Sequence, residues 1–124
     1  NVSERRHALR RGFIAEWMAL ISMVMKGYFP LSYRYQGMGG EIDIVMRRGK
    51  TIVFVEVKYR KNDHFGSAAE MVTHAKMRKL IKTAQVWLSQ QKRLKHNIDY
   101  RFDVIAIHDN GRDINWIENA ISEG

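Results

Sequence analysis

The sequence predicts an α/β domain in which helices cover a mixed β-sheet. Apolar residues recur at helical spacing in two segments, while five other segments show strand-like alternation or short apolar runs. The expected order of elements is α-β-β-β-α-β-β. The chain has 124 residues, no cysteine and one proline. This length suits a single domain covering residues 1–124, and the lack of cysteine excludes disulfides and zinc–thiolate sites.

The first helix is expected near the N-terminus. Apolar residues recur every three or four positions from Leu9 to Val24. Ser3 is a suitable N-cap, and Gly27 stands where a left-handed residue would end the helix. We therefore expect the helix to lie between these two residues.

Three strands are expected next. Residues 28–35 are rich in aromatic side chains, and Pro30 predicts either an edge strand or the start of a strand. Residues 41–48 and 51–58 have similar lengths and are joined by a tight connection at residues 49–50, which predicts a hairpin. The second hairpin strand is nearly all apolar on both faces, as is typical of a central strand in a covered sheet.

The C-terminal half is expected to hold one helix and two strands. Helical spacing of apolar residues predicts a helix over about residues 73–91. Strands are expected at residues 102–108 and, after an Asn-Gly turn, near residues 114–117. No apolar stretch approaches the roughly 20 residues that cross a bilayer, so we expect no membrane association and a cytoplasmic location.

Basic charge is concentrated in the second predicted helix and the segment after it. The chain holds 21 Lys and Arg against 13 Asp and Glu, a net charge of +8, and residues 71–98 contain no acidic residue. A solvated helix face is the simpler interpretation, and a surface that binds phosphates is the functional one. On the functional interpretation, the residues that contact nucleic acid are Arg60, Lys61, Lys76, Arg78, Lys79 and Lys82.

Acidic side chains in the two hairpin strands predict a metal site. With a two-residue turn, the hairpin register places Asp43 directly opposite Glu56. The same register places Glu41 opposite Lys58. Opposed carboxylates are destabilising unless they share a proton or bind a cation. Oxygen ligands select a hard ion, so Mg²⁺ is the expected cofactor, Mn²⁺ an able substitute and the Val57 carbonyl a further ligand. The alternative is a carboxylate cluster that Lys58 neutralises without a metal.

The same residues resemble the pattern of a known protein family. Asp43, separated by twelve residues from Glu56-Val57-Lys58, resembles the D…ExK signature of the PD-(D/E)XK nucleases, which have the restriction-endonuclease-like fold. The chain is also similar to the YraN family, which looks like a distant relative of archaeal Holliday junction resolvases. The residues that carry this closer resemblance are Gly40-Glu41-Ile42-Asp43, Val53 to Lys58 with Arg60, Phe65-Gly66 and Arg101-Phe102-Asp103. The resemblance covers about residues 12–107 and implies a three-layer sandwich with an α-β-β-β-α-β core.

The resemblance implies a role for each residue of the predicted site. Asp43 and Glu56 would hold the metal, and Lys58 would orient or activate the attacking water. Glu16 matches the helix glutamate of resolvase-like members, which completes the set of metal ligands. Ile42 departs from the pattern because it replaces the proline that gave the superfamily its name. The implied activity is that of a Mg²⁺-dependent endonuclease that hydrolyses phosphodiester bonds of nucleic acid, with branched or single-stranded DNA as the expected substrate.

Two side chains near the predicted site, Glu41 and His64, are accessory candidates. The alternative function is a catalytically silent module on the same fold that binds nucleic acid or a protein. Resolvase-like nucleases often dimerise to cut two strands, so a homodimer is a further expectation. A DNA-processing protein that supplies the substrate is the other partner to consider.

Overall fold

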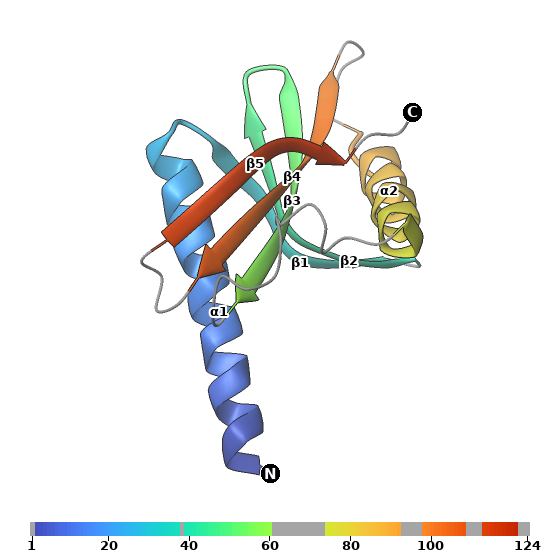
Figure 1. Cartoon of the computed structure of the whole chain (residues 1–124). Coiled ribbons are helices and arrows are strands. Elements are labelled where there is room, and N and C mark those ends of the chain that lie inside the picture. The colour runs from blue at the N-terminus through green and yellow to red at the C-terminus, as the bar shows by residue number, and fades with distance from the viewer. Residues whose placement is uncertain (1, 38, 61–73, 93–97, 109–112, 122–124) are drawn as a thin grey trace.

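A computed structural model shows a five-stranded sheet with one helix packed on each of its faces (Figure 1). It describes residues 2–37, 39–60, 74–92, 98–108 and 113–121. The described elements are α1 (Val2–Met25), β1 (Phe29–Gly37), β2 (Gly40–Arg48), β3 (Thr51–Arg60), α2 (His74–Ser89), β4 (Asp99–His108) and β5 (Asp113–Ile121). The predicted order and type of these elements are confirmed.

The sheet is mixed, as expected. Its strands lie in the order β1-β2-β3-β4-β5. The β3–β4 pair is parallel, and the three other neighbouring pairs are antiparallel. The connection between the two parallel strands includes α2, so the helix covers one face of the sheet. This three-layer α/β architecture is consistent with the restriction-endonuclease-like fold.

Two strands are longer than the sequence pattern predicted. β4 begins at Asp99 rather than residue 102 and pairs with β3 from its first residue. The Asp99 N–H also donates a 2.9 Å hydrogen bond to the Lys50 carbonyl at the hairpin turn. β5 extends from Asp113 to Ile121 rather than over residues 114–117. The added residues are mostly polar, so the apolar pattern that predicted these strands stops before their ends.

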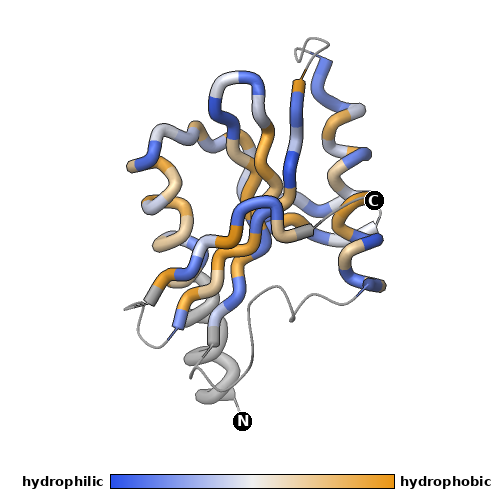
Figure 2. Tube along the Cα trace, turned by 45° about the horizontal axis from the view of Figure 1, so that its top comes forward, coloured by the Kyte–Doolittle hydropathy of each residue, from blue (hydrophilic) through white to orange (hydrophobic). Residues whose placement is uncertain are grey.

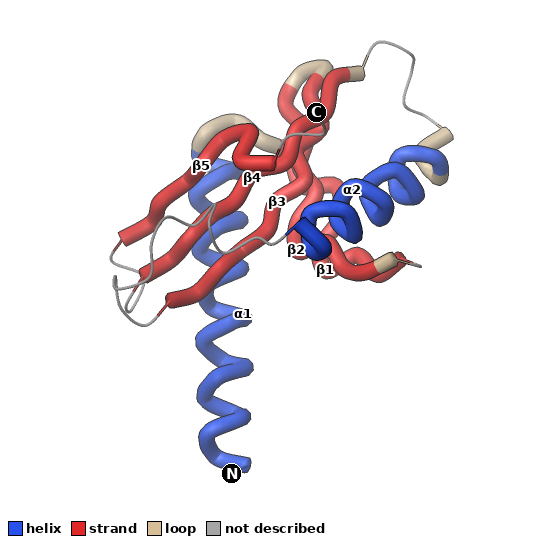
Figure 3. Tube along the Cα trace, turned by 45° about the vertical axis from the view of Figure 1, so that its right-hand side comes forward, coloured by secondary structure: helices blue, strands red, loops and turns tan. Residues whose placement is uncertain are grey.

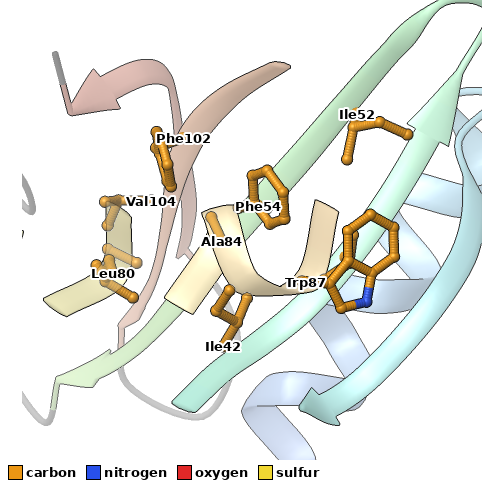
Figure 4. Packing of buried hydrophobic residues seen from close by; sticks show 10 residues of the cluster. Ile42, Ile52, Phe54, Leu80, Ala84, Trp87, Phe102 and Val104 are labelled. Atoms are coloured by element: carbon orange, nitrogen blue, oxygen red, sulfur yellow. The ribbon is translucent and has the colours of Figure 1, made fainter. Parts of the chain in front are cut away.

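The core is divided between the two faces of the sheet. On the α2 face, Phe54 stacks on Phe102 with ring centroids 5.3 Å apart and meets Trp87 edge-on at 5.7 Å (Figure 4). On the α1 face, the small side chains of Ala15 and Ala19 let the helix approach the sheet closely. β3 is buried on both faces over most of its length, which confirms the prediction of a central strand. The site residues at the end of β3 therefore follow directly after a buried central strand.

The outer strand β5 is fixed to β4 by a buried carboxylate. Asp103 is fully buried and accepts hydrogen bonds from Arg101 Nε at 3.0 Å and Trp116 Nε1 at 2.8 Å. It also accepts a 2.9 Å bond from the backbone N–H of Asn119. Asn119 has a left-handed φ of 52°, and the β4–β5 register shifts nearby, between residues 102 and 104. Asp103 therefore stabilises an irregular part of the sheet.

The sheet begins with an edge strand that contains the only proline of the chain. Pro30 is the second residue of β1, and the β1–β2 register shifts between residues 30 and 32. This confirms the position predicted from the missing N–H donor. A search of the described helices finds none that is both long and apolar enough to span a membrane.

Candidate functional site

The predicted site lies where β2 and β3 separate. The hairpin has the expected two-residue turn, and its pairing continues from Arg48–Thr51 to Ile44–Val55. Beyond Ile44, β2 no longer pairs with β3 but remains paired with β1. The ends of β1 and β2 then lie beside α2 (Figure 3). The separation leaves space between β2, the end of β3 and α2.

The separation changes how Asp43 and Glu56 meet. The prediction that they form an opposed pair of the ladder is wrong, because the β2–β3 ladder ends one pair earlier. Instead, Asp43 Oδ2 accepts a 2.8 Å hydrogen bond from the backbone N–H of Val57. The predicted pairing of Glu41 with Lys58 is also absent from the ladder, which ends at Ile44–Val55, and among the described strand residues Glu41 pairs only with Gln36 of β1. Asp43 and Glu56 nevertheless line the same pocket.

Glu56 is a buried carboxylate with two amine partners. Lys58 Nζ lies 3.2 Å from Glu56 Oε1, and Lys76 Nζ of α2 lies 2.9 Å from the same oxygen. The Glu56 side chain is only 10% exposed. Lys58 shares a face of β3 with Glu56 because side chains two positions apart point the same way. The carboxylate is thus neutralised by one lysine from the sheet and one from the helix.

The pocket has a volume of about 210 Å³ and combines acidic with basic side chains. It is lined by Gly40, Glu41, Asp43, Glu56, Lys76, Lys79 and Leu80. Gly40 has a φ of +153°, which other residues rarely adopt. A Cβ atom at this position would lie 3.5 Å from Thr83 Oγ1 and 3.9 Å from Lys79 Cβ. Both distances are ordinary contacts, so the backbone conformation rather than lack of space favours glycine here, and Gly40 forms part of the pocket wall.

The electrostatic environment shifts the ionisation of the site. Burial, together with the charge of Glu56, raises the pKa of Asp43 to about 7. Burial also lowers the pKa of Lys58, and its contact with Lys76 lowers it further. Burial alone would lower the pKa of Lys76, but its hydrogen bonds with Lys58 and Glu56 more than offset this, so the net shift is upward. Lys76 is therefore the more firmly charged of the two amines.

Glu16 is held by β1, next to the pocket rather than in its lining. Its Oε2 atom accepts hydrogen bonds from Tyr33 Oη at 2.7 Å and from Arg34 Nε at 2.8 Å. The charge of Glu16 contributes to the raised pKa of Asp43. Arg34 has a left-handed φ of 54°, a conformation that costs free energy in residues other than glycine. No local pattern in the sequence marks Tyr33 and Arg34 as partners of Glu16.

The basic residues predicted to contact nucleic acid are partly on one surface. Lys76 and Lys79 line the pocket, and Arg78 and Lys82 are exposed on α2. The Arg60 backbone belongs to β3, but its side chain is not among those that the structure describes. Lys61 and His64, also predicted near the site, lie outside the described residues. The accessory candidate Glu41 is exposed and lines the pocket.

The donor set suits a hard divalent cation. Mg²⁺ is commonly held by one or two carboxylates while water fills its other positions, and Asp43 and Glu56 supply two carboxylates to an open pocket. Within the described part of the chain, no three His, Cys, Asp or Glu side chains form a ready-made metal cluster. The expected contributions of Glu16 and of the Val57 carbonyl remain predictions.

These features define the class of the protein as a three-layer α/β domain with an acidic and basic pocket at the end of its central strand. The chain belongs to the Uncharacterised protein family UPF0102, whose family model matches residues 15–107. This confirms the expected membership of the YraN family. The matched region includes the four predicted catalytic residues Glu16, Asp43, Glu56 and Lys58.

Relatives from Vibrio and Aliivibrio extend the similarity over nearly the whole chain. The chain is 76% identical over 109 residues to a UPF0102 protein of Vibrio parahaemolyticus, covering 88% of this chain and 89% of the relative. It is 51% identical over 123 residues to a UPF0102 protein of Aliivibrio fischeri, covering 99% of this chain and 100% of the relative. A UPF0102 protein of Vibrio campbellii is 81% identical over 85 residues, or 68% of this chain and 70% of the relative.

Proposed function

We propose that this protein is a cytoplasmic Mg²⁺-dependent endonuclease of the PD-(D/E)XK type, which hydrolyses phosphodiester bonds in branched or single-stranded DNA. One observation carries the proposal: Asp43 and Glu56 share an open pocket with lysine side chains at the end of β3. Two carboxylates placed so close are unfavourable for stability alone. Binding of a catalytic cation would offset the repulsion between the two carboxylates.

The carboxylates would hold the cation. Asp43 and Glu56 are the primary ligands, and Glu16 and the Val57 carbonyl are the candidates for further positions. When bound, Mg²⁺ would make water easier to deprotonate and would offset the charge that develops on the phosphate. The hydrogen bond from the Val57 N–H fixes the orientation of the Asp43 carboxylate, so that one ligand is already positioned.

Lys58 is the residue that we propose to act on the attacking water, through its position beside Glu56. Its amine lies beside Glu56, and its side chain is only 13% exposed. Because its pKa is lowered, Lys58 is more readily found as a neutral amine that accepts a proton. After accepting the proton, the ammonium would stabilise the negative charge on the phosphate.

The exposed cations of α2 would bind the DNA backbone. Arg78, Lys79 and Lys82 are exposed on this helix, and Lys79 also reaches the pocket. Phosphate contacts by such side chains do not depend on sequence and weaken steeply as salt is added. We therefore expect little sequence preference, with substrate geometry as the main determinant of cleavage.

A second candidate function is a binding module without turnover. It is favoured by the two ion pairs of Glu56, because Lys58 and Lys76 neutralise this carboxylate without a metal. Such a module would keep its affinity for nucleic acid when Asp43 is replaced by Asn.

A second copy of the chain is the partner that we propose for an apolar surface on α1 and β1. The large exposed side chains of this outer apolar surface are Ile14, Trp17, Ile21, Val24, Met25, Phe29, Leu31 and Tyr33. At 100° per residue, the α1 members point away from the buried Ala15, Ala19 and Met23. The described part of α1 is apolar over much of its length (Figure 2). The Trp17 and Tyr33 rings, 6.2 Å apart, join the helix to the strand.

The size of the outer apolar surface favours a copy of the chain as its occupant. It exposes apolar area on the order of several hundred Å², comparable to the roughly 800 Å² that each partner buries in a standard interface. The surface is self-complementary in chemistry, because its members are apolar, whereas the chain as a whole carries a charge of +8.

A panel of labelled DNA substrates tests the endonuclease. Single-stranded, duplex, flap and four-way-junction DNA are incubated with the protein in Mg²⁺, Mn²⁺ or EDTA. We expect metal-dependent cleavage of one geometry, lost in Asp43→Asn, Glu56→Gln and Lys58→Met. Glu118→Gln, which changes an exposed carboxylate on β5, is the control and should cleave normally. No cleavage in any condition would overturn the enzymatic proposal and leave the binding module.

A further inference from the structure

We propose that the ammonium group of Lys76 is a resident counter-ion of the carboxylate pocket, which a divalent cation must displace and which then binds a substrate phosphate. The inference rests on the proposed metal site but assigns a role that the proposed mechanism does not need. Lys76 would thereby set the affinity of the site for the cation and link cation binding to phosphate binding.

The first argument is the position of the Lys76 amine. Its Nζ atom lies 2.9 Å from Glu56 Oε1 and lines the same pocket as Asp43, whose negative charge also attracts it. A cation held by both carboxylates would be drawn to this same region of negative potential. A divalent cation there would strongly repel the Lys76 ammonium, which already lies beside the Lys58 amine at Glu56 Oε1. Binding of a metal therefore requires Lys76 to move.

The second argument is that the Lys76 side chain is more exposed to solvent than the Lys58 side chain. Both amines contact Glu56 Oε1, but the Lys76 side chain is 40% exposed and that of Lys58 only 13%. A lysine on an exposed helix can turn its four-carbon chain toward solvent at little cost. Lys58 is confined by the sheet and remains beside the carboxylate.

The third argument is where Lys76 stands in its helix. It is in the first turn of α2, and this turn contains no acidic residue. Cations are disfavoured at this end of a helix because the backbone N–H groups give it positive potential. The carboxylate of Glu56 offsets that repulsion, so Lys76 loses a favourable partner when a metal replaces it. A substrate phosphate would give Lys76 a new anionic partner. Lys76, Lys79 and the positive end of α2 would then contact the same anion.

The consequence is a cooperative site. Without substrate, Lys76 competes with the cation and weakens its binding. With substrate, the phosphate holds Lys76 away from Glu56, so the cation binds more tightly. Thermodynamic reciprocity requires the cation to strengthen phosphate binding by the same factor.

Calorimetric titration of Mn²⁺ into the intact metal-free protein tests this role without measuring cleavage. Lys76→Gln removes the competing charge, so we expect it to bind Mn²⁺ about tenfold more tightly than the wild type, within the usual range of coupling between two sites. Lys79→Gln is the matched control, because it removes the same charge from the same helix and pocket but has no ion pair with Glu56 among those described. It should raise the affinity much less. Lys76→Arg keeps the charge and should remain close to the wild type.

Thermal unfolding provides a second measurement on the same variants. In EDTA, Lys76→Gln should unfold at a lower temperature than the wild type because buried Glu56 has lost a partner. Saturating Mn²⁺ should raise its unfolding temperature more than that of the wild type. A Lys79→Gln variant should show neither change.

The outcomes separate this inference from the proposed nuclease activity. Equal Mn²⁺ affinity in Lys76→Gln and the wild type would overturn the role of Lys76 even if the protein cleaves DNA. Tighter binding by Lys76→Gln in a protein that cleaves no DNA would overturn the nuclease and keep the counter-ion. Absence of Mn²⁺ binding in both proteins would overturn the metal site and this inference together.

Discussion

The Asp43 carboxylate accepts its 2.8 Å hydrogen bond from the backbone N–H of Val57 at the point where β2 stops pairing with β3. In a continued hairpin, the backbone of β2 would provide the acceptor for a β3 donor. Here the Asp43 side chain is the acceptor instead. The same carboxylate therefore lies at the end of the β2–β3 ladder and lines the pocket. Replacing it must therefore be judged on both stability and function.

The raised pKa of Asp43 predicts an unusual dependence of stability on pH in the metal-free protein. The folded pKa of about 7 lies above the ordinary value of 3.8, so the folded state binds more protons than the unfolded state between these values. Stability should then fall as the pH rises from about 4 to about 7, by on the order of 2–4 kcal/mol. Urea unfolding in EDTA at a series of pH values measures this loss.

The Asp43→Asn variant isolates the contribution of this group. Its amide oxygen still accepts the bond from Val57 but carries no charge, so the decline between pH 4 and pH 7 should become much shallower. Mg²⁺ should restore stability to the wild type at pH 8 and not to the variant. An unchanged pH profile in Asp43→Asn would show that another group controls stability in this range.

Much of the hairpin could be predicted because its information is local. Two apolar strands and a Gly-Lys turn fix the register from Arg48–Thr51 to Ile44–Val55, and the structure has this register. Alternation alone placed Asp43 and Glu56 on a common site. It could not show that β2 turns away from β3 one pair before them, because that separation depends on how β1, β2 and α2 pack together.

The contacts of the site residues with other elements could not be predicted from the sequence pattern for the same reason. Lys76 was predicted only as a phosphate contact, and its ion pair with Glu56 depends on the position of α2 over the sheet. Glu16 was predicted only from the family resemblance, and its contacts with Tyr33 and Arg34 depend on how β1 lies against α1. Periodicity locates the faces of elements, whereas these contacts join elements distant in sequence.

Backbone strain at Arg34 predicts different effects for two small substitutions. Arg34→Ala removes the ion pair with Glu16 and keeps an unfavourable left-handed φ of 54°, so it should destabilise the protein by about 1–2 kcal/mol. Arg34→Gly loses the same ion pair but adopts this φ without strain, so it should be more stable than Arg34→Ala by about 1 kcal/mol. Urea unfolding of both variants measures the difference. Equal stabilities would mean that the backbone at this position carries no strain.

Asp103 should be among the most sensitive positions for stability. Asp103→Ala leaves the guanidinium of Arg101 and the N–H groups of Trp116 and Asn119 without their buried acceptor. We expect a loss of about 3–5 kcal/mol, typical of breaking a buried ion pair. Chemical denaturation provides the value. Glu118→Gln is the control, since Glu118 is exposed and 3.8 Å from Arg101, and it should change stability by less than about 0.5 kcal/mol.

The outer apolar surface predicts a dimer in solution. Ile21 lies on the exposed side of α1, more than half of its surface is open to solvent, and Trp17 lies one helical turn away. Ile21→Asp and Trp17→Asp each introduce a charge that would be desolvated at a symmetric interface, and the symmetry places it there twice. We expect sedimentation equilibrium to show a dimer for the wild type and a monomer for both variants.

The matched control for the dimer is Ile114→Asp. Ile114 is an exposed apolar residue of β5, at the opposite edge of the sheet from β1, so this change adds the same charge outside the outer apolar surface. The variant should remain dimeric. A wild type that stays monomeric at every concentration would show that a different partner, or none, covers the surface. If Ile114→Asp dissociates the dimer and Ile21→Asp does not, the dimer interface lies at the β5 edge of the sheet and not on the outer apolar surface.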